Sequence, residues 1–288
     1  MGLIVYGFIN SLSLVLISIG FALAYGVSRL PNFAHGALYI LTGYLAWVLL
    51  NTVHVPYPLA IPLALVASAL FGGMIYQLIL IHVRGMPVSE IIASFAVGLA
   101  ILEFLRWTGL RGTTYTLPTF LEGTIDVLGV PVDLQRMLIL AAGVVVIVAL
   151  WLFTHYVKIG LALRAIAQDE QAALMLGIDS DLAAAVAISL GSALAGLGAL
   201  LILPLGNITT QTGYDVLIFA IAVSVCGGLG SWAGAIMAAF VLGFAQIITV
   251  EYIAPHFQVV VAMLTIIVIL IVRPSGLFGK QKELEERV

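Results

Sequence analysis

Nine long runs of apolar residues constrain what this chain can fold into more than any other feature. A helix that spans a bilayer needs about 20 mostly apolar residues, and the runs cover residues 3–27, 34–53, 57–82, 88–110, 136–157, 182–203, 215–230, 231–250 and 257–273. Only 9% of the residues are charged and 62% are hydrophobic, whereas soluble domains are roughly 45–50% apolar and about 25% charged. We therefore predict an all-α, polytopic integral membrane protein with eight or nine transmembrane helices.

These runs predict a single transmembrane domain over residues 1–288 in a lipid bilayer. The seventh and eighth runs are short and rich in glycine, so residues 215–250 either cross twice or re-enter the membrane. No Lys or Arg precedes Arg29; since a secretory signal needs a basic start, residues 3–25 are expected to be a retained span. The formal net charge of −3 makes nucleic acid an unexpected partner.

The basic residues are distributed asymmetrically between the connections, which predicts the orientation of the chain. With the loop after Lys158 placed in the cytoplasm, only three basic residues fall at or near the outside: Arg106, Arg111 and Arg136. Eight fall inside: Arg29, Arg84, Lys158, Arg164, Arg273, Lys280, Lys282 and Arg287. We predict an external N-terminus, a cytoplasmic tail over residues 274–288, and an external loop over residues 111–135 that forms a short hairpin or an interfacial helix.

Residues 158–181 are unusually polar for this chain, with six charged side chains between two apolar runs. One predicted helical face carries Arg164, Gln168 and Gln171, and the other carries Leu163, Ile166, Ala167 and Leu174. Gly177 stands where such a helix would stop. An amphipathic helix held at the membrane face favours docking to a soluble partner.

An internal repeat is also expected. The first run is followed by a polar break at residues 28–36 and the sixth by one at residues 204–214, and each break contains Pro, Asn and Gly. The predicted orientation puts one break inside and the other outside, as an inverted-topology repeat requires. The first four spans would then match the last four, with the fifth linking them; chance similarity between glycine-rich segments is the alternative.

Several polar groups stand in or beside the spans. Asn32 and His35 occupy the first break, either capping a helix start or contacting a transport pathway. Glu103 and Arg106 lie three residues apart in the fourth run and can neutralise each other on one helix face. The best candidates for pathway-lining polar groups in the second break are Asn207, Thr209, Thr210 and Gln211.

The glycines between residues 227 and 234 predict a bend that serves either tight packing or a broken helix in a moving core. Cys226 is the only cysteine, which excludes an intrachain disulfide and any multi-cysteine metal site. We expect no metal site and no catalytic residue.

Motifs in four regions of the chain, taken in order, resemble one family. N-F-A-H-G occupies residues 32–36, and R-A-x-A-x-[DN]-x-x-x-A-x-x-x-G-I-[DN] starts at Arg164. A P-x-G at Pro204 precedes G-G-x-G-S-x-x-G-A at residues 227–235, and R-P-x-G-L-x-G occupies residues 273–279. Over residues 10–280 the chain resembles the permease subunits of ABC importers for branched-chain amino acids, a group that also handles other hydrophobic amino acids, short amides and urea.

The resemblance implies an assembly in the bacterial inner membrane. Two permease chains, usually different ones, would form the pathway; two ATPase subunits would hydrolyse ATP-Mg, and an external binding protein would deliver the substrate. The segment 158–181 resembles the loop that couples a permease to its ATPase, with Arg164, Ala165, Asp169, Glu170 and Gly177 as the implied coupling residues. No phosphate-binding G-x-x-x-x-G-K-[ST] motif occurs, so a partner chain is expected to carry ATP.

Three alternatives depend on other features. An ion-coupled carrier normally needs a membrane-embedded carboxylate, for which Glu103 is the candidate. A passive channel would not need the docking segment. A membrane-embedded enzyme would need a cluster of His, Asp or Glu, or a serine with a base, and the sequence shows no such pattern.

Overall fold

The computed structural model describes residues 1–109 and 115–279. Within them it has nine long helices: α1 (Gly2–Ser28), α2 (His35–Asn51), α3 (Tyr57–Ile75), α5 (Pro87–Thr108), α6 (Leu134–Tyr156), α9 (Ser180–Ile202), α10 (Thr210–Gly227), α11 (Trp232–Tyr252) and α12 (Gln258–Val272). The shorter elements are α4 (Ile81–Val83), α7 (Lys158–Gln168), α8 (Glu170–Met175), the 3-10 turns Leu203–Leu205 and Pro255–Phe257, and the strands β1 (Thr124–Val127) and β2 (Val130–Asp133).

The predicted all-α membrane architecture is confirmed. Among the described residues, eight helical segments are long and apolar enough to cross a membrane, including one of 27 residues in which a π-helical turn, Tyr76–Leu80, joins α3 to α4. The helix α2 has 17 residues, so it reaches only about 26 Å at 1.5 Å per residue. From the sequence, residues 215–250 could either cross the membrane twice or re-enter it. In the structure α10 and α11 are two separate helices, each long enough to span the membrane.

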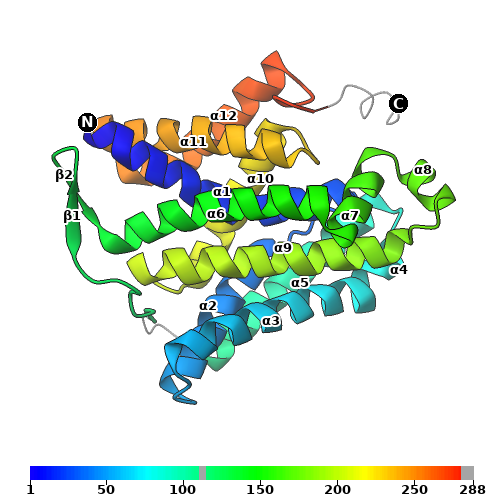
Figure 1. Cartoon of the computed structure of the whole chain (residues 1–288), viewed down its shortest axis with the longest axis horizontal. Coiled ribbons are helices and arrows are strands. Elements are labelled where there is room, and N and C mark those ends of the chain that lie inside the picture. Colours follow the sequence, from blue (N-terminus) through cyan, green and yellow to red (C-terminus); the bar gives the residue numbers. More distant parts are fainter. Residues whose placement is uncertain (110–114, 280–288) are drawn as a thin grey trace.

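Helices α1 and α9 form the centre of the bundle and run antiparallel (Figure 1). They approach closely at Gly20 and Gly191, where a Cβ on either residue would collide with the backbone carbonyl of the other. Glycine is required there because any side chain would push the two helix backbones apart.

The two halves of the chain repeat one packing pattern. Helix α1 packs against α11 as α9 packs against α3, and α2 contacts α9 as α10 contacts α1. A second reciprocal glycine contact, between Gly36 of α2 and Gly213 of α10, joins the equivalent helices of the two halves. With α6 linking the halves, this arrangement is the expected inverted-topology repeat.

The bundle has two distinct ends. The N-terminus and the β1–β2 hairpin lie at one end, and α4, α7 and α8 lie at the other (Figure 1); we call them the hairpin end and the α8 end. The described basic residues that were predicted to lie inside are at the α8 end: Arg29, Arg84, Lys158, Arg164 and Arg273. Arg106 and Arg136 lie towards the hairpin end. The two groups of basic residues that the sequence separated therefore lie at opposite ends of the bundle.

A hairpin is present in the predicted external loop. Its strands pair antiparallel from Thr124–Asp133 to Val127–Val130, and Leu128 and Gly129 have left-handed φ values of 54° and 79°. Two left-handed residues suit a tight hairpin turn. Residues 111–114 of this loop lie outside the described residues, as do 280–288 of the predicted tail.

The predicted amphipathic helix of residues 158–181 is divided in two, which corrects one expectation. Asp169 is extended (φ −156°, ψ 102°), and its carboxylate accepts a hydrogen bond from the Ala172 backbone N–H, which starts α8. Leu163 and Ile166 of α7 are buried as expected, but the break rotates α8, so Ala173 is buried and Leu174 is 50% exposed. Gly177 ends α8 with φ 81°, as predicted.

The glycine-dense bend separates α10 from α11. Gly228 and Gly230 have φ values of 100° and 85°, and the Ser231 hydroxyl caps α11 by accepting from the Gly234 N–H at 3.0 Å. The tail packs on this bend: the N–H groups of Leu277 and Phe278 donate to the carbonyls of Cys226 and Gly227 at 2.8 and 2.9 Å. Two motifs about 40 residues apart in sequence thus form one unit.

Candidate functional site

A cavity of about 830 Å³ opens near the α8 end of the bundle. Both halves of the repeat supply its walls, which is where inverted-repeat transporters bind their substrates. The break after α1 provides part of the lining, and irregular backbone at membrane depth is tolerated where it lines a cavity. The lining residues are Phe21, Tyr25, Ser28, Arg29, Leu30, Pro31, Phe33, Arg84, Gly85, Glu90, Ile91, Glu170, Ile221, Val225 and Leu229.

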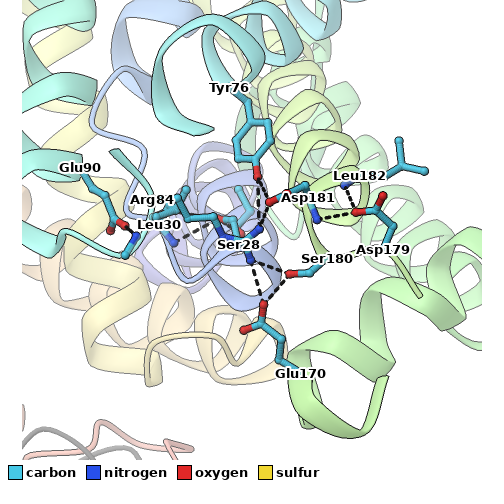
Figure 2. A network of polar contacts seen from close by, with 12 residues as sticks. Ser28, Leu30, Tyr76, Arg84, Glu90, Glu170, Asp179, Ser180, Asp181 and Leu182 are labelled. Carbon is cyan, nitrogen blue, oxygen red and sulfur yellow. Dashed lines mark hydrogen bonds and ion pairs between the residues drawn. The ribbon is translucent and has the colours of Figure 1, made fainter. Parts of the chain in front are cut away.

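Arg84, which directly follows α4, organises a polar cluster in the cavity wall (Figure 2). One guanidinium nitrogen donates to the Glu170 carboxylate at 2.9 Å and to the Ser180 hydroxyl at 2.6 Å, and the other donates to Asp181. The Tyr76 hydroxyl of the π-helical turn donates to the same Asp181 carboxylate at 3.2 Å. The cluster therefore joins α4, α8 and the start of α9.

The Arg84 side chain is 23% exposed, so solvent still reaches this cluster and screens its ion pairs. Burial works against the charge, but Tyr76 and the carboxylates of Asp181 and Glu170 favour it, and the balance raises the pKa of Arg84 above its ordinary value. Because the guanidinium stays charged throughout the physiological range, the connection it makes is permanent unless the elements move apart.

Glu90 lies in the first turn of α5 and is only 5% exposed. Its Oε1 accepts a hydrogen bond from the Gly85 backbone N–H at 2.6 Å, which closes the turn between Arg84 and α5 (Figure 2). A carboxylate at a helix N-terminus is favoured by the helix dipole. Arg84, Gly85 and Glu90 all line the cavity, so this hydrogen bond holds one part of its wall in place.

The predicted residues Asn32 and His35 lie behind the cavity wall. Asn32 is 3% exposed, and its side-chain oxygen accepts from the Ala34 N–H at 3.1 Å. His35 is 2% exposed, and its Nε2 donates to the Ile17 carbonyl of α1 at 2.8 Å. Both side chains hold the break in shape, while their neighbours Pro31 and Phe33 line the cavity.

The second predicted polar set lies at the opposite, hairpin end, around the start of α10. The Thr209 hydroxyl caps α10 by accepting from the Thr212 N–H at 3.2 Å, and the Gln211 amide donates to Asp215 at 3.2 Å. Thr210 is half-buried and Asn207 is exposed. None of the four lines the 830 Å³ cavity, and their contact with a transport pathway stays a prediction.

Comparison with known proteins decides the family. The family described as "Branched-chain amino acid transport system / permease component" matches residues 3–270. The chain belongs to this family.

Curated relatives of this permease support the assignment over most of its length. The high-affinity branched-chain amino acid transport system permease protein BraD of Pseudomonas aeruginosa is 28% identical, over 92% of this chain and 91% of the relative. LivH of Escherichia coli K12, with the same description, is 26% identical over the same shares. The probable branched-chain amino acid transport permease protein LivH of Methanocaldococcus jannaschii is 27% identical, over 92% and 88%.

A solved structure shares the fold. PsaBC from Streptococcus pneumoniae in complex with Fab matches with a TM-score of 0.53 and 11% identity, over 100% of this chain and 96% of that chain. At this identity the likeness concerns the fold alone.

The predicted coupling residues of the permease lie on α7, α8 and the turn after them. Arg164 and Gly177 are exposed, Ala165 is half-buried, and Asp169 caps α8. Glu170 is connected to the spans by its ion pair with Arg84, and Ala165 packs against a buried cluster that includes Val27 of α1 and Ala183 of α9. The end of α8 exposes two large apolar side chains, Met175 at 88% and Leu176 at 80%.

Sequence reasoning missed Arg84, Glu90 and the Tyr76–Asp181 contact as members of a site. The sequence drew the prediction to Glu103 and Arg106 instead. These two side chains pair at 3.6 Å, but both are at least 60% exposed on the outer face of α5. A signal for Glu90 existed, because it is a carboxylate in the first turn of an apolar run that starts at a proline. No local signal marked Arg84, whose partners lie 86 and 97 residues away.

Proposed function

We propose that this chain is the membrane-spanning permease subunit of an ATP-driven importer for branched-chain or other hydrophobic amino acids. It works by alternating access and has no catalytic residue of its own. ATP-Mg is hydrolysed by two partner ATPase subunits, a second permease chain completes the pathway, and an external binding protein delivers the cargo. The N-terminus and the loop 111–135 face outwards, and the tail 274–288 faces the cytoplasm of a bacterial cell.

The segment α7–α8 is the observation that carries this proposal. Helix α8 lies at the end of the bundle (Figure 1), and Met175 and Leu176 expose their apolar side chains between the exposed polar residues Gln171 and Asp179 of the same segment. Such exposed apolar groups mark a protein contact surface when polar residues surround them. The ATPase subunit is the partner proposed for this surface, with Arg164, Ala165, Asp169, Glu170 and Gly177 as its supporting residues.

The Arg84 cluster supplies a route from this surface to the cavity. Glu170 lies at the start of α8, and its ion pair with Arg84 joins α8 to the turn at Gly85, which is hydrogen-bonded to Glu90 of α5. A displacement of α8 by the ATPase therefore acts on the cavity wall through Arg84. The π-helical turn Tyr76–Leu80 lies directly before α4, and such turns are frequent at functional sites.

The test is purification of the tagged chain in mild detergent, with mass spectrometry of the proteins that accompany it. We expect an ATPase subunit to co-purify and to be lost in the double variant Met175→Asp/Leu176→Asp. The matched control is Leu128→Asp, which changes a 71% exposed leucine at the hairpin end and should leave recovery unchanged. A purified chain that moves radiolabelled leucine into liposomes without ATP would overturn the proposal in favour of a carrier or a channel.

The carrier alternative rested on Glu103, which does not line the 830 Å³ cavity. Its side chain is 60% exposed on the face of α5 that carries Arg106. No observation on the described residues favours the channel or the enzyme alternative over the importer.

A further inference from the structure

The cavity combines an apolar surface with a buried carboxylate, and this combination suits one class of cargo. Apolar side chains of α1 and α10, among them Phe21, Ile221 and Val225, line it from the two halves of the repeat, and Tyr25 and Phe33 add two more aromatic rings. Its volume of about 830 Å³ lies within the range of about 300–1,000 Å³ that small-molecule sites occupy.

Glu90 is the most buried charged group in this cavity. Its Oε1 is held by the Gly85 N–H, and within residues 1–109 and 115–279 no cationic side chain forms an ion pair with it. The second carboxylate oxygen accepts no hydrogen bond from those residues. A buried carboxylate is costly without a cationic partner, so this oxygen is available to an ammonium group that enters the cavity.

The same lining also carries groups that suit a carboxylate. Two arginines, Arg29 and Arg84, line the cavity, so its wall carries positive charge as well as a carboxylate. Arg84 is engaged by Glu170 and Asp181, so it contributes positive potential more than a new ion pair. A solute with one ammonium group, one carboxylate and an apolar side chain matches this distribution.

We propose that Glu90 accepts the α-ammonium group of an aliphatic amino acid held in this cavity between the two halves of the repeat. The inference rests on the proposed function and adds a residue that discriminates the cargo. It places the cargo beside Glu170 and Arg84, so the same cluster that contacts α8 borders the bound molecule.

The variant Glu90→Gln tests the charge alone, because the amide oxygen of glutamine can still accept from the Gly85 N–H. Hydrogen bonds to charged groups contribute about 1.5–3 kcal/mol, which corresponds to a factor of about 10 to 140. In proteoliposomes that hold the complete complex, we expect ATP-driven uptake of radiolabelled leucine to fall about tenfold or more. Glu103→Gln, on the exposed face of the same helix, is the control and should keep uptake near the wild-type level.

A second measurement does not depend on the variant. Binding to the wild-type complex, without binding protein or nucleotide, is compared for leucine and 4-methylpentanoate, which is leucine without its ammonium group. We expect leucine to bind at least about tenfold more tightly. Equal binding of the two, or wild-type uptake by an assembled Glu90→Gln complex, would overturn the role of Glu90.

These outcomes separate the two proposals. If wild-type complex shows ATP-driven leucine uptake but Glu90→Gln does not reduce it, only the ammonium site fails. If the wild-type complex takes up no leucine with ATP, or takes it up through an ion gradient alone, the importer proposal fails as well. Recovery of the ATPase subunit with Glu90→Gln reports whether that variant has assembled.

Discussion

Arg84 and Glu170 form an ion pair at 2.9 Å across 86 residues of sequence, and this pair joins α8 to the transmembrane bundle. Ser180 and Asp181, at the start of α9, bind the same guanidinium. One side chain thus connects the surface proposed for the ATPase, a central helix of the repeat and the wall of the cavity.

Replacing Arg84 is expected to weaken coupling more than assembly. Arg84→Ala should leave the ATPase subunit bound while leucine taken up per ATP hydrolysed falls several-fold, because α8 loses its connection to the cavity wall. Arg84→Lys should restore part of the ratio, since a lysine makes one point contact and cannot bridge two carboxylates. Uptake and phosphate release are measured in the same proteoliposomes.

The control for Arg84 is Arg136→Ala, which breaks the Arg136–Asp133 pair of 3.3 Å at the hairpin end. Exposed pairs of this kind contribute about 0–1 kcal/mol, so uptake per ATP should stay unchanged. If the Arg84→Ala complex takes up as much leucine per ATP hydrolysed as the wild type, Arg84 is not part of the coupling route.

Gly177 is expected to tolerate no bulky side chain without loss of coupling. Its φ of 81° is left-handed, and a non-glycine residue there costs on the order of 1–2 kcal/mol. Gly177→Val should shift the turn after α8 and uncouple ATP hydrolysis from transport. Substrate-stimulated ATPase activity is the measurement, and an unchanged value would contradict the role of this turn.

The matched control for Gly177 is Gly129→Val in the hairpin turn. Gly129 has a similar φ of 79°, and a Cβ at either position would meet no atom within 4 Å. The two substitutions therefore introduce comparable backbone strain at opposite ends of the bundle. Only the one at the α8 end should affect stimulation of the ATPase.

The contact between α1 and α9 predicts a stability effect rather than a transport effect. Gly191→Leu places a side chain against the Gly20 carbonyl, which lies 2.6 Å from a Cβ at that position. Overpacking of this kind costs about 1–3 kcal/mol or more. The thermal midpoint of the detergent-solubilised protein should fall by several degrees, while Gly2→Leu, where a Cβ meets nothing within 4 Å, should leave it unchanged.

The tail packed on the α10–α11 bend gives another stability prediction. Gly276 has a φ of 78° and lies against Gly228 and the Val225 carbonyl. Gly276→Val combines left-handed strain with a collision, so it should lower the thermal midpoint and expose the buried thiol of Cys226. The rate of Cys226 alkylation measures this opening; a wild-type rate would show that the tail does not hold the bend.

The sequence by itself determined the parts of this protein that depend on local pattern. Apolar runs long enough for a bilayer predicted the spans, because every backbone polar group in a membrane must be satisfied within a helix. The amphipathic face of α7 and the stop at Gly177 also followed from short-range periodicity and from the conformational freedom of glycine. The asymmetry of basic residues followed from their placement in connections, where charge avoids the hydrocarbon.

Only the tertiary structure decided which of these parts meet. The break at Asp169 turned Leu174 outwards because an aspartate that caps the next helix outcompetes one continuous amphipathic helix. The Arg84 cluster, the packing of residues 273–279 on the bend and the place of Glu90 in a cavity involve residues far apart in sequence. Hydropathy and spacing cannot give such contacts, because they depend on how two antiparallel halves pack through Gly20–Gly191 and Gly36–Gly213.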